Sequence, residues 1–244
     1  MPELVVLITG SDRGLGIEFV RQYAARGDTV IATCRSPERA SELRALAARH
    51  ANVTIEKLDV TSDAEVRALA AQYRGRPIDI LVNNAGVLGA NGEQSLGSLG
   101  RRHFHEVMDV NAYGPLAVSQ AFLDSVLAGS GRKIVALTSG LGSISVAGRM
   151  PKAPYYYRMS KAALNMGMQA LGADLKTQGI AVAVLSPGTA DTDMFAQYRE
   201  GYGANRSGQS PAAAVEGMIR VIDELTPERA AQAILRYDGS LVGW

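Results

Sequence analysis

Short apolar runs alternate along the chain with longer segments in which apolar residues recur at helical spacing. Nearly continuous apolar runs indicate strands buried on both faces of a sheet, and the helical periodicity indicates helices that cover those faces. Six strands are predicted over Leu4–Thr9, Thr29–Cys34, Val53–Leu58, Ile78–Asn83, Lys133–Thr138 and Ile180–Ser186, and a short seventh ends near Leu235–Tyr237.

The amphipathic segments between these strands predict the helices. They cover Gly16–Ala25, Pro37–Ala48, Ala64–Tyr73, about Arg101–Leu127, about Tyr156–Thr177 and Ala212–Glu224. Alternating strands and helices predict an α/β fold: a doubly wound parallel sheet with helices on both faces. No repeat or low-complexity stretch divides the chain, so residues 1–244 are expected to form a single domain.

One stretch departs from this regular pattern. Gln197–Ser210 is rich in glycine and polar residues and lies between two periodic segments. Such a composition is typical of a mobile loop. We therefore expect residues 190–212 to form a substrate lid, the alternative being an insertion without a role.

Composition and charge exclude several classes of function. The chain has 244 residues and a formal net charge of +1, which argues against a nucleic-acid-binding surface. It has one cysteine, Cys34, and its three histidines show no metal-ligand spacing, so no metal site is predicted. It has no apolar run of the roughly 18 residues that a membrane span needs, and its start lacks a basic leader. A cytoplasmic protein is expected.

A glycine-rich turn lies where the first strand ends and the first helix begins. Its sequence is Thr9-Gly10-Ser11-Asp12-Arg13-Gly14-Leu15-Gly16. Glycines there allow a tight turn and the close approach of a pyrophosphate to the backbone, and the helix N-terminus then faces the anion. The turn therefore predicts dinucleotide binding, although a glycine-rich turn is often only a turn.

The end of the second strand bears on the choice of dinucleotide. An acidic residue there would hold the ribose 2′-hydroxyl of NAD, but the chain has Thr33-Cys34-Arg35. Guanidinium groups suit a 2′-phosphate, and both Arg13 and Arg35 are placed to reach one. We therefore expect NADP(H), the alternative for Arg35 being a solvated surface charge.

Tyr157 and Lys161 are the most informative pair of side chains. They are four residues apart, so on a helix they project from one face. An ammonium ~4 Å from a phenol contributes roughly 4 kcal/mol at an effective dielectric of about 20. Such an attraction would offset burial and lower the pKa of the phenol toward neutrality. The alternative is an ordinary exposed helix pair.

Several motifs appear in the order found in short-chain dehydrogenases/reductases, and the chain resembles that family over nearly its whole length. The motifs are the TGxxxGxG turn, Asp59, Asn83-Asn84-Ala85-Gly86, Asn111, Ser139, Tyr157 with Lys161, and Pro187-Gly188. The segments Ala233–Gly239 and Tyr157–Asn165 look like the C-factor and sniffer-type carbonyl reductase branch. The resemblance implies a single-domain Rossmann fold.

The resemblance also implies catalytic roles for four residues. Tyr157 would be the general acid that protonates a carbonyl oxygen as hydride arrives. Lys161 would lower the pKa of Tyr157 and bind the nicotinamide ribose. Ser139 would hydrogen-bond the substrate oxygen, and Asn111 would hold a water that connects Lys161 to solvent.

Proline supplies a physical reason for the role of Asn111. An α-helix would bond the N–H of residue 115 to the carbonyl of Asn111, but Pro115 has no N–H. Gly114 loosens the helix further. The carbonyl of Asn111 is thus expected to be free for a water, the alternative being an ordinary proline kink.

Other cofactor contacts follow from the resemblance. Asp59 and Val60 would lie at the adenine, although Asp59 could instead cap a helix N-terminus. Asn84, Ala85 and Gly86 would lie under the adenosine ribose. Thr192, which follows Pro187-Gly188, would bind cofactor phosphate or the carboxamide.

The chain departs from the family pattern before the catalytic helix. Ser139 precedes Tyr157 by 18 positions, several more than usual, with the extra residues in Ala147–Pro154. Ser139 keeps its place after the fifth strand, and Ser143 is the fallback. Tyr155 and Tyr156 also precede the helix, but neither has a lysine four residues on, so both are expected to line the pocket or pack.

The predicted pocket is mostly apolar and has no arginine that would clamp an anion. Its walls are expected to be Leu88, Leu141, Ile144, Met150, Tyr156, Met194, Phe195 and Tyr198. A hydrophobic ketone, aldehyde or imine fits such walls, which indicates an NADPH-dependent carbonyl reductase. The alternatives are an alcohol dehydrogenase working oxidatively and a cofactor-binding signalling protein without turnover. The family's habit implies a homodimer or homotetramer built on the long fourth and fifth helices.

Overall fold

The computed structural model describes residues 3–149, 154–203, 205 and 207–244. One sheet of eight strands runs through it in the order β3-β2-β1-β4-β5-β6-β7-β8. All neighbours pair in parallel except β7 and β8. The strands are β1 Val5–Thr9, β2 Thr29–Cys34, β3 Val53–Lys57, β4 Ile80–Asn83, β5 Lys133–Leu137, β6 Ala181–Ser186, β7 Ile234–Arg236 and β8 Leu241–Val242.

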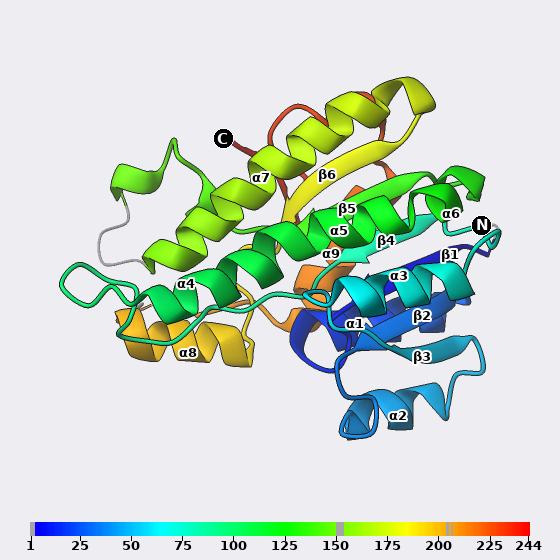
Figure 1. Ribbon diagram of the computed structural model, residues 1–244, viewed down its shortest axis with the longest axis horizontal. Helices are drawn as coiled ribbons and strands as arrows, with labels where there is room; N and C mark the ends of the chain where they lie inside the picture. Colours follow the sequence, from blue (N-terminus) through cyan, green and yellow to red (C-terminus); the bar gives the residue numbers. More distant parts are fainter. Residues whose placement is uncertain (1–2, 150–153, 204, 206) are drawn as a thin grey trace.

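Helices cover both faces of this sheet, and Figure 1 shows α3, α5 and α7 side by side on one of them. The predicted doubly wound α/β fold is confirmed. The helices are α1 Gly14–Arg26, α2 Ser41–Ala47, α3 Asp63–Gln72, α4 Arg101–Met108, α5 Gly114–Ala121, α6 Leu123–Ala128, α7 Tyr155–Leu175, α8 Asp193–Tyr202, α9 Pro211–Asp223 and α10 Pro227–Ala230.

The alternation of side chains along each strand divides the core into two layers. Val6 and Ile8 of β1 pack with residues of α1, α2 and α9. Leu7, between them, packs on the opposite face with residues of α3, α5 and α7. Because both faces are covered, the central strands are apolar almost throughout, which is the pattern that made them visible in the sequence.

Strand β1 lies between β2 and β4. The chain passes from β1 to β2 and β3 on one side of it and then crosses back to β4 on the other side. At such a switch point the loops beyond the carboxyl ends of the strands diverge and leave a crevice. The glycine-rich turn follows β1 and Asn84 follows β4, so both lie at this edge of the sheet. The fold thus brings the predicted cofactor residues together.

Several elements differ from the prediction, and one of them, the short helix α10, was not predicted at all. The long helix expected over 101–127 is interrupted by a π-helical turn, Asp109–Tyr113, and again at Phe122, which separates α5 from α6. In the π-helical turn, Gly114 donates its backbone N–H to the carbonyl of Asp109. The Gly114-Pro115 pair accounts for the first break, because Pro115 cannot donate to Asn111.

The stretch expected to be a loose loop begins as a helix. Residues 197–202 belong to α8, which Thr192 caps by accepting a hydrogen bond from the Phe195 N–H at 3.3 Å. Gly203, with φ of 65°, ends the helix in the left-handed conformation. The polar composition of α8 reflects its position on the surface, because none of its side chains is fully buried.

The eighth strand was missed because it has two residues, and Leu241 is 53% exposed.

The part of the chain that the structure describes has no helix both long and apolar enough to cross a membrane. Among the same residues, no group of three or more His, Cys, Asp or Glu side chains could hold a metal ion.

Asp79 ties the amino ends of the central strands together. Its carboxylate accepts hydrogen bonds from the backbone N–H groups of Val5, Ser130 and Gly131 at 2.7 to 2.9 Å. Burial disfavours the charged form of this carboxylate, but these hydrogen bonds outweigh burial and lower the pKa of Asp79.

We expect Asp79→Asn to lower the free energy of unfolding by about 2 kcal/mol or more, since hydrogen bonds to a charged group contribute roughly 1.5–3 kcal/mol each. A carboxyl with a lowered pKa stabilises the fold above its ordinary pKa, and this contribution is lost as pH falls through the folded value. Urea denaturation should therefore show a difference between wild type and variant that shrinks below about pH 4. The exposed Asp124→Asn is the control, and an equal loss there would contradict the assignment.

Candidate active site

The glycine-rich turn has the shape of an anion-binding cradle. Gly10 and Gly14 have φ of 66° and 56°, a conformation that favours glycine. A Cβ on Gly16 would collide with the carbonyl oxygen of Gly10. Arg13 occupies the N-cap of α1, and a guanidinium has no acceptor with which to cap the helix. The first backbone N–H groups of α1 therefore remain suited to a phosphate.

Asn84 fastens this turn to the end of β4. Its side-chain amide donates to the carbonyls of Thr9 and Gly10 at 2.9 and 2.8 Å. The N–H groups of Asn84 and Ala85 both donate to the Thr9 hydroxyl at 3.1 Å. A Cβ on Gly10 would lie 2.8 Å from the Cα of Ala85. Asn84 and Ala85 thus shape the floor of the cradle.

The other residues predicted to bind the cofactor differ in their exposure and in their contacts. Arg13 and Arg35 are exposed, and among the described residues neither forms an ion pair. The methyl group of Thr192 would lie 3.8 Å from a Cβ on Gly14, so Thr192 borders the turn. Ser11 points away, because its hydroxyl donates to Ile8 and its N–H to Thr33.

Asp59 does not cap a helix. Its carboxylate accepts hydrogen bonds from the N–H and hydroxyl of Thr61 at 2.9 and 2.7 Å, while Ser62 caps α3. The alternative assignment of Asp59 as a helix cap is therefore wrong. Val60, which was also predicted to lie at the adenine, is buried and packs near Gly114.

Tyr157 and Lys161 both lie buried on one face of α7. The ammonium of Lys161 donates to the carbonyl of Leu137, at the end of β5, at 2.8 Å. The same nitrogen lies 5.7 Å from the centre of the Tyr157 ring. The predicted shared face is thus present, and the pair is not an exposed one.

Burial changes the acidity of both groups in a way that the sequence argument did not anticipate. Burial raises the pKa of Tyr157 to about 12, against the lowering effect of its hydrogen bond with Ser139. Burial lowers the pKa of Lys161 to about 8. The expectation that the ammonium brings the phenol toward neutrality is therefore wrong for this state of the protein, because Lys161 is held by Leu137.

Asn111 is fully buried, and its side chain connects the loop after β4 with α7. Its Oδ1 accepts from the N–H of Val87, and its Nδ2 donates to the Val87 carbonyl, both at 2.8 Å. Nδ2 also donates to the Ser160 hydroxyl at 3.0 Å, and that hydroxyl donates to the Tyr157 carbonyl. A Cβ on Gly86 would lie 3.3 Å from Asn111 Oδ1 and 3.6 Å from Lys161 Nζ.

The structure distinguishes between the two candidate serines. Ser139 lies at the start of a 3-10 turn, Gly140–Gly142, and hydrogen-bonds with Tyr157. Ser143 instead donates to the Gly243 carbonyl at 2.6 Å and bonds with Ser145. Ser143 therefore holds the C-terminal segment, and Ser139 is the serine beside Tyr157.

Comparison with known proteins gives the same result as this geometry. The family described as short chain dehydrogenase matches residues 4–203. The chain belongs to the short-chain dehydrogenase/reductase family.

Individual relatives point to one branch of the family. C-signal of Myxococcus xanthus is 36% identical over 179 residues, which cover 73% of this chain and all of that protein. The NADPH-bound carbonyl reductase from chicken fatty liver superposes with a TM-score of 0.87 at 30% identity and full coverage of both chains. Carbonyl reductase Sniffer of D. melanogaster gives 0.86 at 27% identity, covering 99% of this chain and all of that one. The predicted resemblance is confirmed.

Two further residues hold the site of this short-chain dehydrogenase and were missed in the sequence. Asn165 accepts a hydrogen bond from Thr138 at 2.6 Å and donates to the Gly142 carbonyl at 3.3 Å. Gln94 accepts one from the N–H of Tyr157 at 3.1 Å. Asn165 could have been found, since it lies one helical turn after Lys161 on the same face.

The predicted pocket walls are divided between buried and open positions. Tyr156 is buried edge-on against Phe104, with ring centres 5.4 Å apart. Phe195, Tyr198 and Tyr202 form a stack along α8. Leu88 is buried, while Leu141 and Met194 are half-buried. Ile144 is 76% exposed, so it encloses nothing in this state, and Met150 lies outside the described residues.

The buried ammonium of Lys161 should give the enzyme a distinctive pH dependence of stability. A lysine whose folded pKa is lowered destabilises the fold while it is charged, and this cost is relieved as pH rises from about 8 to 10.5. The free energy of unfolding of wild type should rise over that window by about 3 kcal/mol relative to Lys161→Met, at about 1.36 kcal/mol for each pKa unit.

Urea denaturation from about pH 7 to about pH 11, which spans both pKa values, measures this difference, with the exposed Lys176→Met as the matched control. Parallel pH profiles for wild type and Lys161→Met would show that the ammonium is not buried as described.

Proposed function

We propose that the protein is an NADPH-dependent reductase that transfers hydride to a small, mostly apolar carbonyl compound, with Tyr157 as the general acid. The observation that carries the proposal is the convergence of a buried phenol, the Ser139 hydroxyl and the Lys161 ammonium at the carboxyl end of β5. Such an arrangement places two donors where one oxygen atom of a substrate can accept from both.

The residues present suit a dinucleotide with a 2′-phosphate. The open N-terminus of α1 and the cradle of Gly10, Gly14 and Gly16 would receive the pyrophosphate. Arg13 and Arg35 would receive the 2′-phosphate, and Thr192 lies beside the turn to contact the phosphate or the carboxamide. When bound, NADPH supplies the hydride. The remaining roles belong to the protein's own side chains.

Ser139 and Tyr157 would orient the carbonyl oxygen and stabilise the charge that develops on it. A phenol with a pKa of about 12 is fully protonated at neutral pH and gives its proton readily to an alkoxide, which is far more basic. Lys161, with a pKa of about 8, is still charged at neutral pH, and its ammonium would bind the nicotinamide ribose. A water on the Asn111 carbonyl would then return a proton through Lys161.

The pKa of Tyr157 determines which protonation state each direction of the reaction starts from, while the cofactor pools set the direction of net turnover. Oxidation of an alcohol needs Tyr157 as a base, so the phenol must first ionise. Burial opposes that ionisation and raises the pKa of Tyr157 to about 12. Reduction starts from the protonated form, which is the one that burial stabilises.

The pocket and the lid suggest an apolar substrate. The aromatic stack of Phe195, Tyr198 and Tyr202 offers flat apolar surface on α8. Gln197 donates to the Gly89 carbonyl at 2.8 Å, and Asn91 donates to the Gln197 carbonyl at 3.0 Å. These bonds hold α8 against the loop after β4, so we propose that residues 190–212 close the site as a lid.

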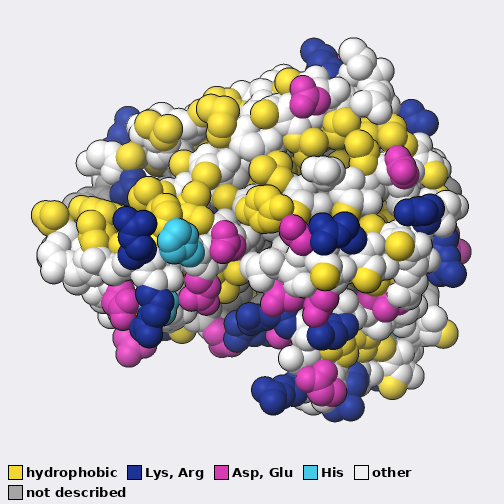
Figure 2. All heavy atoms as spheres, viewed as in Figure 1, with side chains coloured by type: hydrophobic (Ala, Val, Ile, Leu, Met, Phe, Trp, Pro, Cys, Tyr) yellow, Lys and Arg dark blue, Asp and Glu magenta, His cyan; other side chains and the backbone are white. Residues whose placement is uncertain are grey.

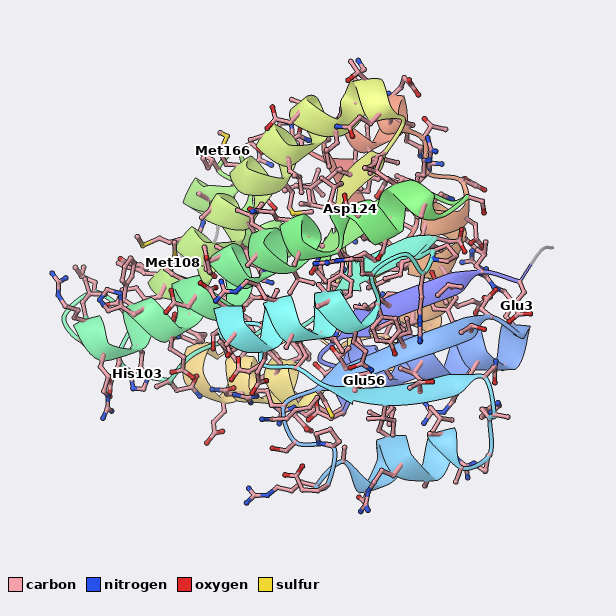
Figure 3. All side chains as sticks on the ribbon, turned by 45° about the vertical axis from the view of Figure 1, so that its right-hand side comes forward. Glu3, Glu56, His103, Met108, Asp124 and Met166 are labelled. Carbon is pink, nitrogen blue, oxygen red and sulfur yellow. The ribbon has the colours of Figure 1, made fainter. Side chains whose placement is uncertain are left out.

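We also propose a homodimer or homotetramer in the cytoplasm. Figure 2 shows hydrophobic side chains gathered over α5 and α7, with charged side chains concentrated nearer α2, α3 and α4. Met166 projects outward from α7 and is 72% exposed, and Met159 and Tyr113 are about half exposed (Figure 3). Burying such side chains against a second copy would remove them from water.

Tyr157→Phe tests the proposed chemistry. The variant should bind NADPH with nearly unchanged affinity, measured by fluorescence titration, because the phenyl ring still fills its site. Its turnover on apolar ketones and aldehydes should fall by a factor of at least ~100, the typical contribution of a positioned general acid.

The control is Tyr155→Phe, which loses an exposed phenol two residues away on the same helix. Activity of Tyr157→Phe equal to wild type on a good substrate would refute the mechanism. Binding of NADPH by wild type without turnover on any carbonyl would favour a signalling protein instead.

The NADPH preference can be tested through Arg35. Arg35→Ala should weaken NADPH binding by about 10- to 100-fold, since a charge-assisted hydrogen bond contributes roughly 1.5–3 kcal/mol. NADH binding should stay almost constant, because NADH lacks the 2′-phosphate. The nearby exposed Arg39→Ala is the control, and a clear preference of wild type for NADH would overturn the assignment of Arg13 and Arg35.

A further inference from the structure

The helix that carries Tyr157 begins without a local cap. The first backbone N–H groups of a helix have no partners within it, and they are usually satisfied by the side chain of the preceding residue. Here α7 begins at Tyr155, and the preceding residue is Pro154, whose side chain has no acceptor. Tyr157 lies in this first turn, so its position depends on what holds the turn in place.

Gln94 supplies the missing acceptors from a distant part of the chain. It lies 63 residues before Tyr157, in the loop between β4 and α4, and is 1% exposed. Its backbone carbonyl accepts from the N–H of Tyr155 at 2.8 Å. Its side-chain Oε1 accepts from the N–H of Tyr157 at 3.1 Å. One residue therefore satisfies two donors of the first turn of α7.

The opposite side of the same amide fixes its orientation. Nε2 donates to the carbonyls of Leu88 and Ala90 at 2.9 and 3.3 Å. Both partners are acceptors, so the nitrogen must face them and the oxygen must face Tyr157. A Cβ on Gly89 would lie 3.0 Å from Nε2 and 2.7 Å from Val107, so the loop packs tightly around the amide. Gln94 is thus a buried and fully oriented link.

We propose that Gln94 is a positioning residue for the general acid, holding the first turn of α7 so that the Tyr157 phenol stays beside Ser139. This inference rests on the proposed function. A side chain that sets the position of a proton donor acts through geometry, and a displacement of 1 Å can cost about 100-fold in rate. Loss of Gln94 should therefore act on the rate of the chemical step more than on cofactor binding.

The loop that carries Gln94 also carries the contacts to α8. Gly89 accepts from Gln197 in that helix, and Gly89 lies between the two carbonyls that hold the Gln94 amide. The contact between α8 and this loop thus lies next to the hydrogen bonds that orient Gln94.

Gln94→Met and Gln94→Glu test the assignment together. Methionine keeps a similar volume but provides no strong acceptor or donor. A protonated glutamic acid, which burial favours, offers a carbonyl to Tyr157 and a hydroxyl to Leu88, so it should restore much of the function. Gln94→Met should lower kcat by about 10- to 100-fold with the KM for NADPH nearly unchanged. The exposed Gln72→Met is the control for substitution of glutamine.

Amide hydrogen exchange of Tyr157 gives a second readout that does not depend on activity. Exchange should be faster in Gln94→Met than in wild type or Gln94→Glu, because the N–H has lost its acceptor. Unchanged exchange would refute the contact, whether or not the wild type reduces carbonyls. Faster exchange together with an unchanged kcat would show that Gln94 caps the helix but does not position the general acid.

Two other outcomes are also decisive. If wild type reduces no carbonyl while exchange responds as expected, the proposed function fails, and Gln94 is only a helix cap. If Gln94→Met does not fold, the proposal is tested with Gln94→Glu alone. Its kcat should then fall as rising pH ionises the introduced carboxyl, which can no longer donate to Leu88. A kcat profile parallel to that of wild type would overturn the proposal.

Discussion

The site depends on the docking of α7 against the carboxyl end of β5. The contact is made by a buried ammonium: Lys161 reaches the carbonyl of Leu137, while Asn165 bonds to Thr138 and Gly142. A Cβ on Gly142 would lie 2.6 Å from the Cβ of Lys161, so only glycine lets the 3-10 turn approach the helix. These contacts place Ser139, at the start of that turn, beside Tyr157 on the helix.

Burial of this contact lowers the stability of the fold, and it also serves the proposed chemistry. A charged lysine in the interior is unfavourable, and the lowered pKa of Lys161 expresses that cost. The same burial keeps the Tyr157 phenol protonated, which is the state that a proton donor needs before each turnover. Stability given up at the site thus serves the proton transfer in the proposed reaction.

The sequence predicted what is encoded by local pattern. The central strands are apolar because both their faces are covered, and the glycine-rich turn is visible because its conformation requires glycine at Gly10 and Gly14. Tyr157 and Lys161 are joined by helical spacing. Pro115 correctly marked a break near Asn111, although the break took the form of a π-helical turn.

What the sequence could not reveal depends on tertiary contacts. The acidity of Tyr157 was misjudged because the partner of Lys161, a backbone carbonyl on β5, has no sequence signature. Gln94 was missed for a similar reason, since it meets α7 only after the loop behind β4 folds back. The end of α8 looked like a loop because residues 197–202 run into a glycine-rich polar segment and none of the helix side chains is fully buried.

The most direct test of the account follows the transferred atom. Wild-type enzyme would be incubated with an apolar ketone or aldehyde and NADPH that carries deuterium at the transferable position of the nicotinamide, in ordinary water. We expect an alcohol with deuterium on the carbon of the former carbonyl group and ordinary hydrogen on its oxygen, detected by NMR and mass spectrometry. Consumption of NADPH without deuterium at that carbon, or no alcohol from any carbonyl in a broad panel, would contradict it.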